Sequence, residues 1–333
     1  MMKPALLITV DTEGDNLWAR PRQVETRNAT YLPRFQELCE KYGFKPTYLT
    51  NWEMAHAPAF VELGRDALRR RTAEIGMHLH AWDTPPLLPL TPDDSATHPY
   101  LTEYPAGLLR AKIGTMTEYL EDLFGTKMLS HRAGRFGFDA VYARALVDFG
   151  YQVDCSVTPY VSWQRQAGDP AGVGGPDFTS FPADAYFLDL DDIARSGASP
   201  LLEVPVTILS PKRLGPVRIL QRQLDRTALG RRVAARLLAD RWFGIESDNK
   251  ATLLDIIRIA RRERRAYLEF FLHSSELMPG GRSWFPDAAS IERLYRDLDE
   301  VFHAAAQHFE GQTLAEFRRR FDDSSVPSVR HAV

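Results

Sequence analysis

Three acidic residues lie close together where the first strand-like run of the chain ends. Asp11 closes the run 5–11, and Glu13 and Asp15 follow it in the stretch TVDTEGD. Residues two apart in an extended chain point to the same side, so the Asp11 and Glu13 carboxylates face one way. Like charges at this spacing repel each other unless a cation lies between them. The pattern predicts a metal-binding or acid–base role and leaves open which of the three acids binds the metal.

Two histidines with the same spacing close another strand-like run. His78 and His80 end the run 74–80, EIGMHLH, and an extended chain turns both imidazoles to one side. Two imidazoles and a carboxylate bind a divalent cation and leave coordination positions open for water, as in catalytic sites. We therefore predict a catalytic divalent metal site at the end of this strand.

Two further polar residues stand at predicted strand ends. Arg132 lies near the end of the run 128–133, where it can orient an acid such as Asp11, and His273 closes the apolar run 266–273. Catalytic groups of parallel α/β folds gather at the carboxyl ends of the strands. His273 is accordingly placed to act as a general acid.

Strand-like runs alternate with amphipathic segments along most of the chain, which favours a parallel sheet covered by helices. Seven such strands predict an α/β fold of the distorted (β/α)7-type barrel class. The predicted strands are 5–11, 45–51, 74–80, 128–133, 152–156, 201–207 and 266–273. The predicted helices are 31–42, 60–70, 108–124, 140–149, 252–262 and 291–309, and a capping box at Thr313 and Glu316 starts one more.

A basic segment interrupts this alternation. Residues 211–243 carry nine Lys and Arg side chains against two Asp, with leucines at roughly helical spacing. We expect a basic helical insertion at about 211–250, either packed on the barrel as a solvated helix or docked on an anionic partner. Weak peripheral association with an anionic membrane surface through 211–243 is the expectation. The chain is otherwise read as one catalytic domain, 1–321, with a flexible tail at 322–333.

Composition excludes several classes of protein. The 333 residues are 44% hydrophobic and 26% charged with a formal net charge of −3, so disorder and nucleic-acid binding are not expected. No apolar run is long enough for a transmembrane segment. Two cysteines make no disulfide framework, and the N-terminal run turns acidic too soon for a secretory signal. We predict a cytoplasmic protein.

In their order along the chain, these motifs resemble those of the polysaccharide deacetylase (NodB-homology, carbohydrate esterase family 4) superfamily. The resemblance runs from about Leu6 to Leu277, and EIGMH at 74–78 and FLHSSEL at 271–277 carry it best. Thr12 separates two acids that are adjacent in the family, and Trp82 stands where the family has its second metal-binding histidine. The sequence is therefore similar to a divergent branch of the superfamily found in bacterial cell-surface polysaccharide clusters. In this chain, the resemblance implies that His80 takes the role of the second metal-binding histidine.

This resemblance implies a metal-dependent hydrolase that removes N-acetyl, or alternatively O-acetyl, groups from a sugar of a glycan or glycan precursor. The implied partner is an N-acetylated saccharide, and the implied cofactor is a divalent metal, Zn²⁺ first, with Co²⁺, Ni²⁺ and Mn²⁺ as alternatives. By resemblance, Glu13, His78 and His80 hold the metal, Asp11 is the base, Arg132 positions Asp11, and Asp154 tunes His273, which protonates the leaving amine.

Two other functions compete with this interpretation. An amidohydrolase-type C–N hydrolase also uses a His-x-His pair, although it places the pair on its first strand. A non-catalytic carbohydrate-binding member of the same fold is the second alternative, favoured by the departures at Thr12 and Trp82. Four loop aromatics can stack on sugar rings or pack in the core, namely Trp82, Tyr160, Trp163 and Trp284.

Overall fold

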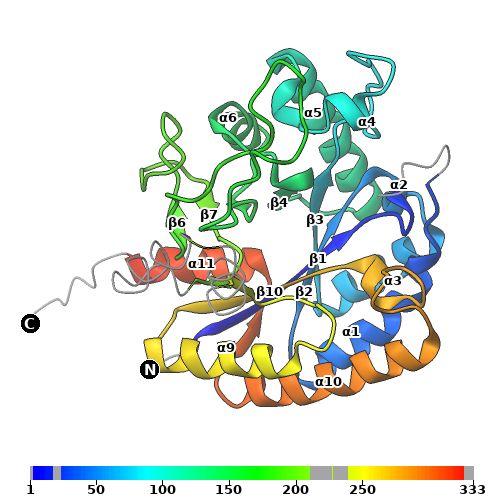
Figure 1. Cartoon of the computed structure of the whole chain (residues 1–333), viewed down its shortest axis with the longest axis vertical. Coiled ribbons are helices and arrows are strands. Elements are labelled where there is room, and N and C mark those ends of the chain that lie inside the picture. Colours follow the sequence, from blue (N-terminus) through cyan, green and yellow to red (C-terminus); the bar gives the residue numbers. More distant parts are fainter. Residues whose placement is uncertain (1–2, 18–23, 211–226, 228–238, 326–333) are drawn as a thin grey trace, which may run out of the picture.

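A curled, mostly parallel sheet forms the centre of the molecule (Figure 1). The computed structural model describes residues 3–17, 24–210, 227 and 239–325. The strand order is β10-β1-β2-β3-β4-β5-β7-β6. The seven parallel strands are β1 (Ala5–Thr12), β2 (Pro46–Thr50), β3 (Glu74–Leu79), β4 (Ser130–Ala133), β5 (Val153–Asp154), β7 (Leu202–Glu203) and β10 (Tyr267–His273). They correspond one for one to the predicted runs, and the distorted (β/α) barrel class is confirmed as an open half-barrel.

Two short strands extend this sheet beyond the predicted set. β6 (Tyr186–Phe187) pairs antiparallel with β7, and β11 (Glu310–Gln312) pairs with the start of β1. β8 (Ile208–Leu209) and β9 (Arg241–Trp242) form a separate antiparallel pair. Gly244, which follows β9, forms a parallel β-bridge with Phe271 of β10. β6 and the segment at Gly244 thus lie at the two edges that a seven-stranded open sheet would expose, whereas β11 pairs with the central strand β1.

The register of the central strands brings their polar ends to one level. Asp11 of β1 lies opposite His273 of β10, and His78 of β3 lies opposite Arg132 of β4. All eight residues of β1 are buried, as expected of a central parallel strand covered on both faces. The candidate site therefore forms where these parallel strands end.

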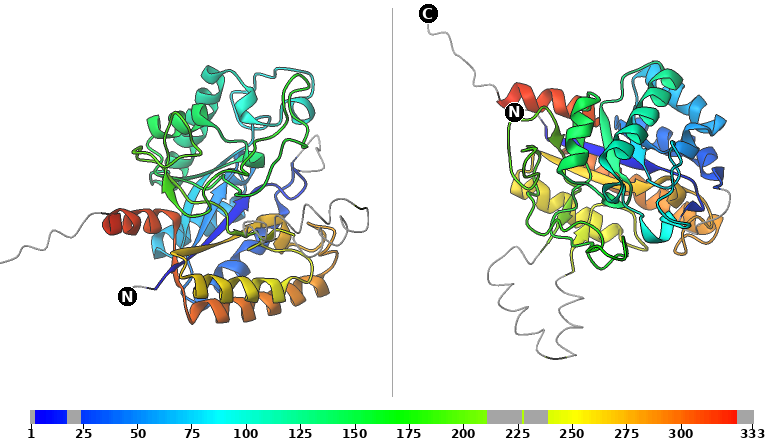
Figure 2. Two further views of the ribbon diagram at one scale, coloured as in Figure 1. Left: turned by 60° about the vertical axis from the view of Figure 1, so that its left-hand side comes forward. Right: turned by 90° about the horizontal axis from the view of Figure 1, so that it is seen from above.

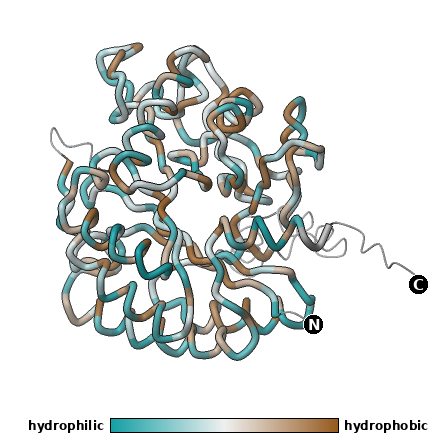
Figure 3. Tube along the Cα trace, turned by 180° about the vertical axis from the view of Figure 1, so that it is seen from behind, coloured by the Kyte–Doolittle hydropathy of each residue, from teal (hydrophilic) through white to brown (hydrophobic). Residues whose placement is uncertain are grey.

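Amphipathic helices cover the sheet, and Figures 1 and 2 show α9 and α10 side by side along one side of it. In α1 (Leu32–Lys41), Leu32, Phe35, Gln36 and Cys39 face the core at the spacing of a helical stripe. Figure 3 shows the same alternation of hydrophobic and hydrophilic residues along the outer helices. The remaining helices are α2 (Trp52–Ala55), α3 (Pro58–Arg70), α4 (Asp94–Thr97), α5 (Ala106–Phe124), α6 (Ala140–Asp148), α9 (Lys250–Glu263), α10 (Ala288–Ala306) and α11 (Leu314–Ser325), with short 3₁₀ turns at Arg27–Tyr31, Leu101–Glu103, Gly134–Phe136 and Ser274–Leu277.

The predicted capping box is present at the start of α11. Thr313 N donates to Glu316 Oε2 at 3.1 Å, and Glu316 N donates to Thr313 Oγ1 at 3.1 Å. α11 continues to Ser325, so residues 322–325, which were assigned to the tail, are helical. The rest of that tail lies outside the described residues.

Most of the predicted basic insertion, including 211–226 and 228–238, also lies outside the described residues. Its end is described and differs from the prediction: residues 241–242 form β9, and the following helix starts only at Lys250. Within the described part of the chain, no helix combines the length and the apolar character that a bilayer span requires.

Candidate active site

Glu13, His78 and His80 converge at the carboxyl ends of β1 and β3. His80 Nε2 lies 3.0 Å and His78 Nε2 lies 3.5 Å from Glu13 Oε2. One ligand atom from each residue lies within 4.8 Å of the other two, and all three residues are buried. In the part of the chain that the structure describes, they are the one group of three or more such side chains with this geometry.

The protonation of this group suits a divalent cation. His78 Nδ1 donates to the carbonyl oxygen of Arg132 at 3.0 Å, so the neutral form of His78 has its lone pair on Nε2, the atom that faces Glu13. Burial by itself would raise the pKa of Glu13, but hydrogen bonds from His78 and His80 hold that pKa well below its usual value. An ionised carboxylate and inward-facing imidazole nitrogens are a donor set for Zn²⁺ and similar ions.

Two residues that the sequence did not single out hold the main chain of Glu13. Ser274 Oγ accepts from Glu13 N at 3.1 Å and donates to Glu13 O at 3.0 Å. Asn28 Nδ2 also donates to Glu13 O, at 2.7 Å. Ser274 belongs to the FLHSSEL motif and could have been found there, whereas Asn28 carries no motif signal.

Gly134 supports the other side of the centre. A Cβ at this position would lie 2.5 Å from His80 Nδ1 and 2.6 Å from the carbonyl oxygen of Leu79. Both distances are too short for any side chain, so the path of β4 next to His80 requires glycine here.

Asp11 lies beside the metal centre and is held by Arg132. Arg132 Nη1 donates to Asp11 Oδ1 at 2.7 Å, and Asp11 Oδ2 lies 4.0 Å from His78 Nε2. Burial alone would raise the pKa of Asp11, but the guanidinium of Arg132, followed by His78 and His273, lowers it overall. Asp11 is therefore an ionised carboxylate next to the three potential ligands.

Arg132 is completely buried and joins three strands of the barrel. Its Nε donates to Cys155 O at 3.0 Å, its Nη2 donates to Thr9 Oγ1 at 2.9 Å, and Nη2 also pairs with the Glu269 carboxylate. These contacts fix the guanidinium that faces Asp11. Glu269 is a further residue that the sequence analysis did not single out.

His273 faces the same centre from β10. Its Nε2 lies 3.9 Å from Glu13 Oε1, and its Nδ1 lies 3.4 Å from Glu276 Oε1. Burial by itself would lower the pKa of His273, but the neighbouring Glu276 carboxylate, with Glu13, raises it overall. The imidazolium form is thus favoured at the position predicted for the general acid.

The role predicted for Asp154 as the partner of His273 is corrected by the structure. Asp154 Oδ1 lies 2.6 Å from His131 Nδ1, and Asp154 Oδ2 accepts from Ser156 N at 2.9 Å. Asp154 is the register partner of His131, and in-register neighbours point to one side of the sheet, away from Arg132. Glu276 occupies the place beside His273.

Asp15, the third acid of the first motif, is also outside the group. Arg27 donates to Asp15 from its backbone N at 3.0 Å and from Nε at 2.9 Å. This ion pair engages Asp15, whereas Glu13 is the acid that lies among the imidazoles.

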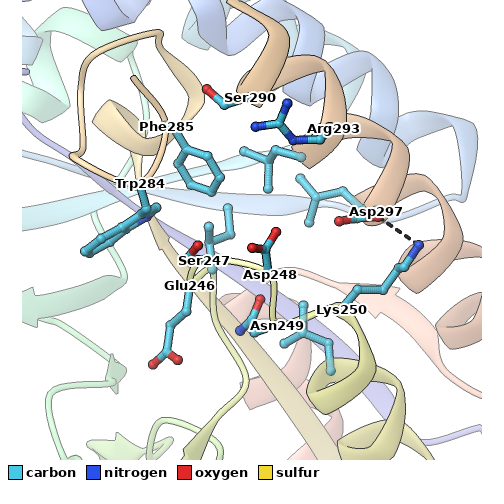
Figure 4. A pocket seen from close by; sticks show the side chains of 14 residues that line it. Glu246, Ser247, Asp248, Asn249, Lys250, Trp284, Phe285, Ser290, Arg293 and Asp297 are labelled. Carbon is cyan, nitrogen blue, oxygen red and sulfur yellow. Dashed lines mark ion pairs between the residues drawn. The ribbon is translucent and has the colours of Figure 1, made fainter. Parts of the chain in front are cut away.

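A cavity of about 270 Å³ adjoins these groups. Asp11, His78 and His273 contribute to its wall, and the loops add Tyr100, Arg135, Phe136, Trp163, Gln166 and Arg282. Among the four loop aromatics, Trp163 lines this cavity and stacks on Phe136, with ring centroids 5.5 Å apart. Trp82 packs on His80 instead, and Trp284 lines a separate small cavity (Figure 4).

No family model matches the sequence, and no curated protein does either. Solved structures are similar in fold. A Mycobacterium smegmatis protein assigned as a polysaccharide deacetylase superposes with a TM-score of 0.53 at 14% identity, over 98% of this chain and 94% of that one. A Parabacteroides distasonis protein assigned as a glycoside hydrolase/deacetylase superposes with a TM-score of 0.57 at 7% identity, over 96% of this chain and 72% of that one. This chain has the fold of the polysaccharide deacetylases, as its ordered motifs predict.

Proposed function

We propose that this protein is a metal-dependent carbohydrate deacetylase, which hydrolyses an N-acetyl, or alternatively O-acetyl, group on a sugar of a glycan or glycan precursor. The observation that carries the proposal is the arrangement at one cavity of a three-ligand donor set, an arginine-held carboxylate and a histidine. The donor set comes from the ends of β1 and β3, Asp11 from β1 and His273 from β10, so the sheet brings these groups together.

The proposed chemistry uses these groups in distinct roles. Glu13, His78 and His80 would hold a divalent cation, Zn²⁺ first, which supplies Lewis-acid polarisation of the acetyl carbonyl. Asp11, kept ionised by Arg132, accepts a proton from the water whose oxygen attacks the carbonyl carbon. His273 donates a proton to the leaving nitrogen as the C–N bond breaks. The products are acetate and a free amino sugar.

The test is acetate release from a panel of N-acetylated and O-acetylated saccharides, with and without chelator. We expect release that is abolished by the chelator and restored by added Zn²⁺. The Asp11→Asn variant, which keeps the three ligands, is the matched inactive control. A protein that binds metal and glycan but releases no acetate would instead be the non-catalytic carbohydrate-binding member.

We further propose a cytoplasmic place of action. Cys39 and Cys155 are both buried as free thiols, and burial raises the pKa of each well above its usual value. Such inert reduced cysteines suit a reducing compartment. The predicted membrane association through 211–243 stays a sequence-based prediction, since most of that segment lies outside the described residues.

A further inference from the structure

We propose that the acetylated saccharide taken by this site is acidic, and that Arg135 and Arg282 bind its carboxylate or phosphate oxygens within the active-site cavity. The inference rests on the proposed function and adds to it the chemical class of the substrate. Both arginines line the cavity that also contains Asp11 and His273.

Of the two arginines, Arg282 provides the stronger evidence for an anion-binding position. Its side chain is 23% exposed, and its Nε is buried with no hydrogen-bond partner among the described residues. The neighbouring carboxylate is that of Glu276, whose Oε1 lies 3.7 Å from Arg282 Nε. A guanidinium has five N–H donors, and oxyanions match their fork geometry.

Glu276 is already engaged with His273. Its Oε2 accepts from His273 N at 3.0 Å, and its Oε1 lies 3.4 Å from His273 Nδ1. Arg282 therefore lies beside the proposed general acid with donors left for a ligand. This position puts the anionic group of the substrate on the side of the leaving nitrogen.

Arg135 reaches the same cavity from an unusual backbone conformation. Arg135 and Phe136 have φ values of +55° and +58°, in the left-handed region that residues other than glycine rarely adopt. Such strain persists where the surrounding structure imposes it, and it is concentrated at functional sites. The guanidinium of Arg135 lies 5.4 Å from the centre of the Tyr100 ring, which also lines the cavity.

The charge of the lining points to an anion. Asp11 is the one carboxylate among the described residues that line the cavity, and Arg132 already neutralises it. Arg135 and Arg282 therefore outnumber the carboxylates in this lining, and the Glu276 carboxylate lies beside Arg282. Arginine pairs with carboxylates and phosphates through two parallel hydrogen bonds, so either group fits this wall.

The small cavity beside Trp284 has the opposite balance (Figure 4). Its volume is about 70 Å³, and an ion pair of 2.8 Å joins Lys250 to Asp297 on its wall. Its charged lining residues are Glu246, Asp248, Asp297, Lys250 and Arg293. Of these two cavities, it is the active-site cavity in whose lining arginines outnumber carboxylates, and this places the anionic group close to the acetylated sugar.

The experiment compares matched substrates on the zinc-loaded full-length protein. Di-N-acetylchitobiose is the neutral substrate, a glucuronate–N-acetylglucosamine disaccharide supplies a carboxylate, and N-acetylglucosamine 1-phosphate supplies a phosphate. We expect kcat/KM for at least one acidic substrate to exceed that for the neutral one by about 10-fold or more, the scale of a charged hydrogen bond. The preferred acidic substrate identifies the source of the anion.

Variants test whether the two arginines cause this preference. Arg282→Gln and Arg135→Gln should each lower the ratio of acidic to neutral kcat/KM by about 10-fold. Arg282→Lys should restore part of the ratio, and Arg293→Gln, an arginine of the small cavity, should leave it unchanged. Equal turnover of neutral and acidic substrates by the wild type would overturn the inference and leave the proposed function intact.

A binding measurement separates the inference from catalysis. Isothermal titration of the Asp11→Asn variant with glucuronate and with inorganic phosphate should show binding of one of them, weakened about 10-fold when Arg282→Gln is added. Failure of both anions to bind overturns the inference even if acetate is released. Binding without acetate release from any substrate supports the anion site and contradicts the proposed function.

Discussion

Each imidazole of the candidate metal centre presents its Nε2 to the carboxylate of Glu13. Removing one of three protein ligands should cost at least about 100-fold in metal affinity, since even the residues behind ligands cost 10–100-fold. We expect His78→Ala and His80→Ala each to lose most of their bound zinc while keeping the fold. Metal analysis of the purified variants, with circular dichroism for the fold, checks this.

His303→Ala is the control, because His303 is an exposed histidine of α10 and is not part of the candidate metal centre. Its metal content should equal that of the wild type. Unchanged metal content in His80→Ala would show that His80 is not a ligand. No residue would then replace the family's second metal-binding histidine, whose position Trp82 occupies.

Asp11 and His273 should affect turnover rather than metal content. Asp11→Asn and His273→Gln should each lower kcat by about 100-fold or more, the usual scale for a positioned base or acid. Stoichiometric zinc in both variants is the accompanying expectation. Loss of zinc from Asp11→Asn would make Asp11 a ligand, with Glu13 then the candidate base.

The protonation states of Asp11 and His273 also predict how kcat/KM depends on pH. Asp11 must be ionised, so kcat/KM should rise with pH through a lowered pKa, below the usual 3.8. His273 must be protonated, so kcat/KM should fall as pH passes its raised pKa, above the usual 6.5. In His273→Gln the alkaline fall should disappear from the residual activity.

At the scale of elements, the metal-binding geometry depends on the close approach of neighbouring strands at their carboxyl ends. Gly134→Ala would place a methyl group 2.5 Å from His80 Nδ1, so either β4 or the imidazole must shift. We expect a loss of zinc affinity of about 10-fold or more, the scale of disturbing a group that orients a ligand. Gly107→Ala is the matched control, because its Cβ meets nothing within 4 Å, and it should bind zinc normally.

The loop after β3 also depends on one buried carboxylate. Asp94 accepts from Leu90 N at 2.8 Å, from Thr91 N at 2.7 Å and from Tyr104 Oη at 2.8 Å. Burial by itself would raise the pKa of Asp94, but these hydrogen bonds lower it below the usual 3.8. The loop carries Tyr100 to the active-site cavity, so its order bears on substrate binding.

Replacing Asp94 by Ala should lower the free energy of unfolding by about 1–3 kcal/mol and increase proteolysis within residues 84–104. Because the folded-state pKa is depressed, this stabilisation is fully present above pH 3.8 and is lost as pH falls through the folded-state pKa. The difference between wild type and Asp94→Asn should therefore shrink in acid. Asp191→Asn, whose side chain is 89% exposed, should show no such difference.

At the scale of the whole molecule, a buried charge network joins β10, β1 and β4. Arg132 contacts Asp11 and Glu269, and all three are buried inside the barrel. Arg132→Met leaves Asp11 charged and unpaired and should cost about 3–5 kcal/mol of stability. Glu269→Gln keeps Asp11 paired and should cost about 1 kcal/mol. Urea unfolding measures both values, and equal losses would contradict this account.

Several parts of the fold and site followed from the sequence because they depend on local periodicity. The seven parallel strands correspond to predicted runs, although only Leu202–Glu203 of 201–207 is regular strand. The His78–His80 pair turns to one side because alternation along a strand is a local property. The same alternation places His131 on the side away from Arg132, where it contacts Asp154.

What the sequence by itself determined is therefore the seven parallel strands, the longer helices, the fold class and the residue types at the strand ends. Only the tertiary structure decided which partner each polar group has. Asn28 meets Glu13, Glu276 meets His273, and Arg27 removes Asp15 from the site, although none of these contacts follows from periodicity. Strand register and loop paths fix such contacts to within an ångström, and both arise from packing across the whole barrel rather than from any local stretch of chain.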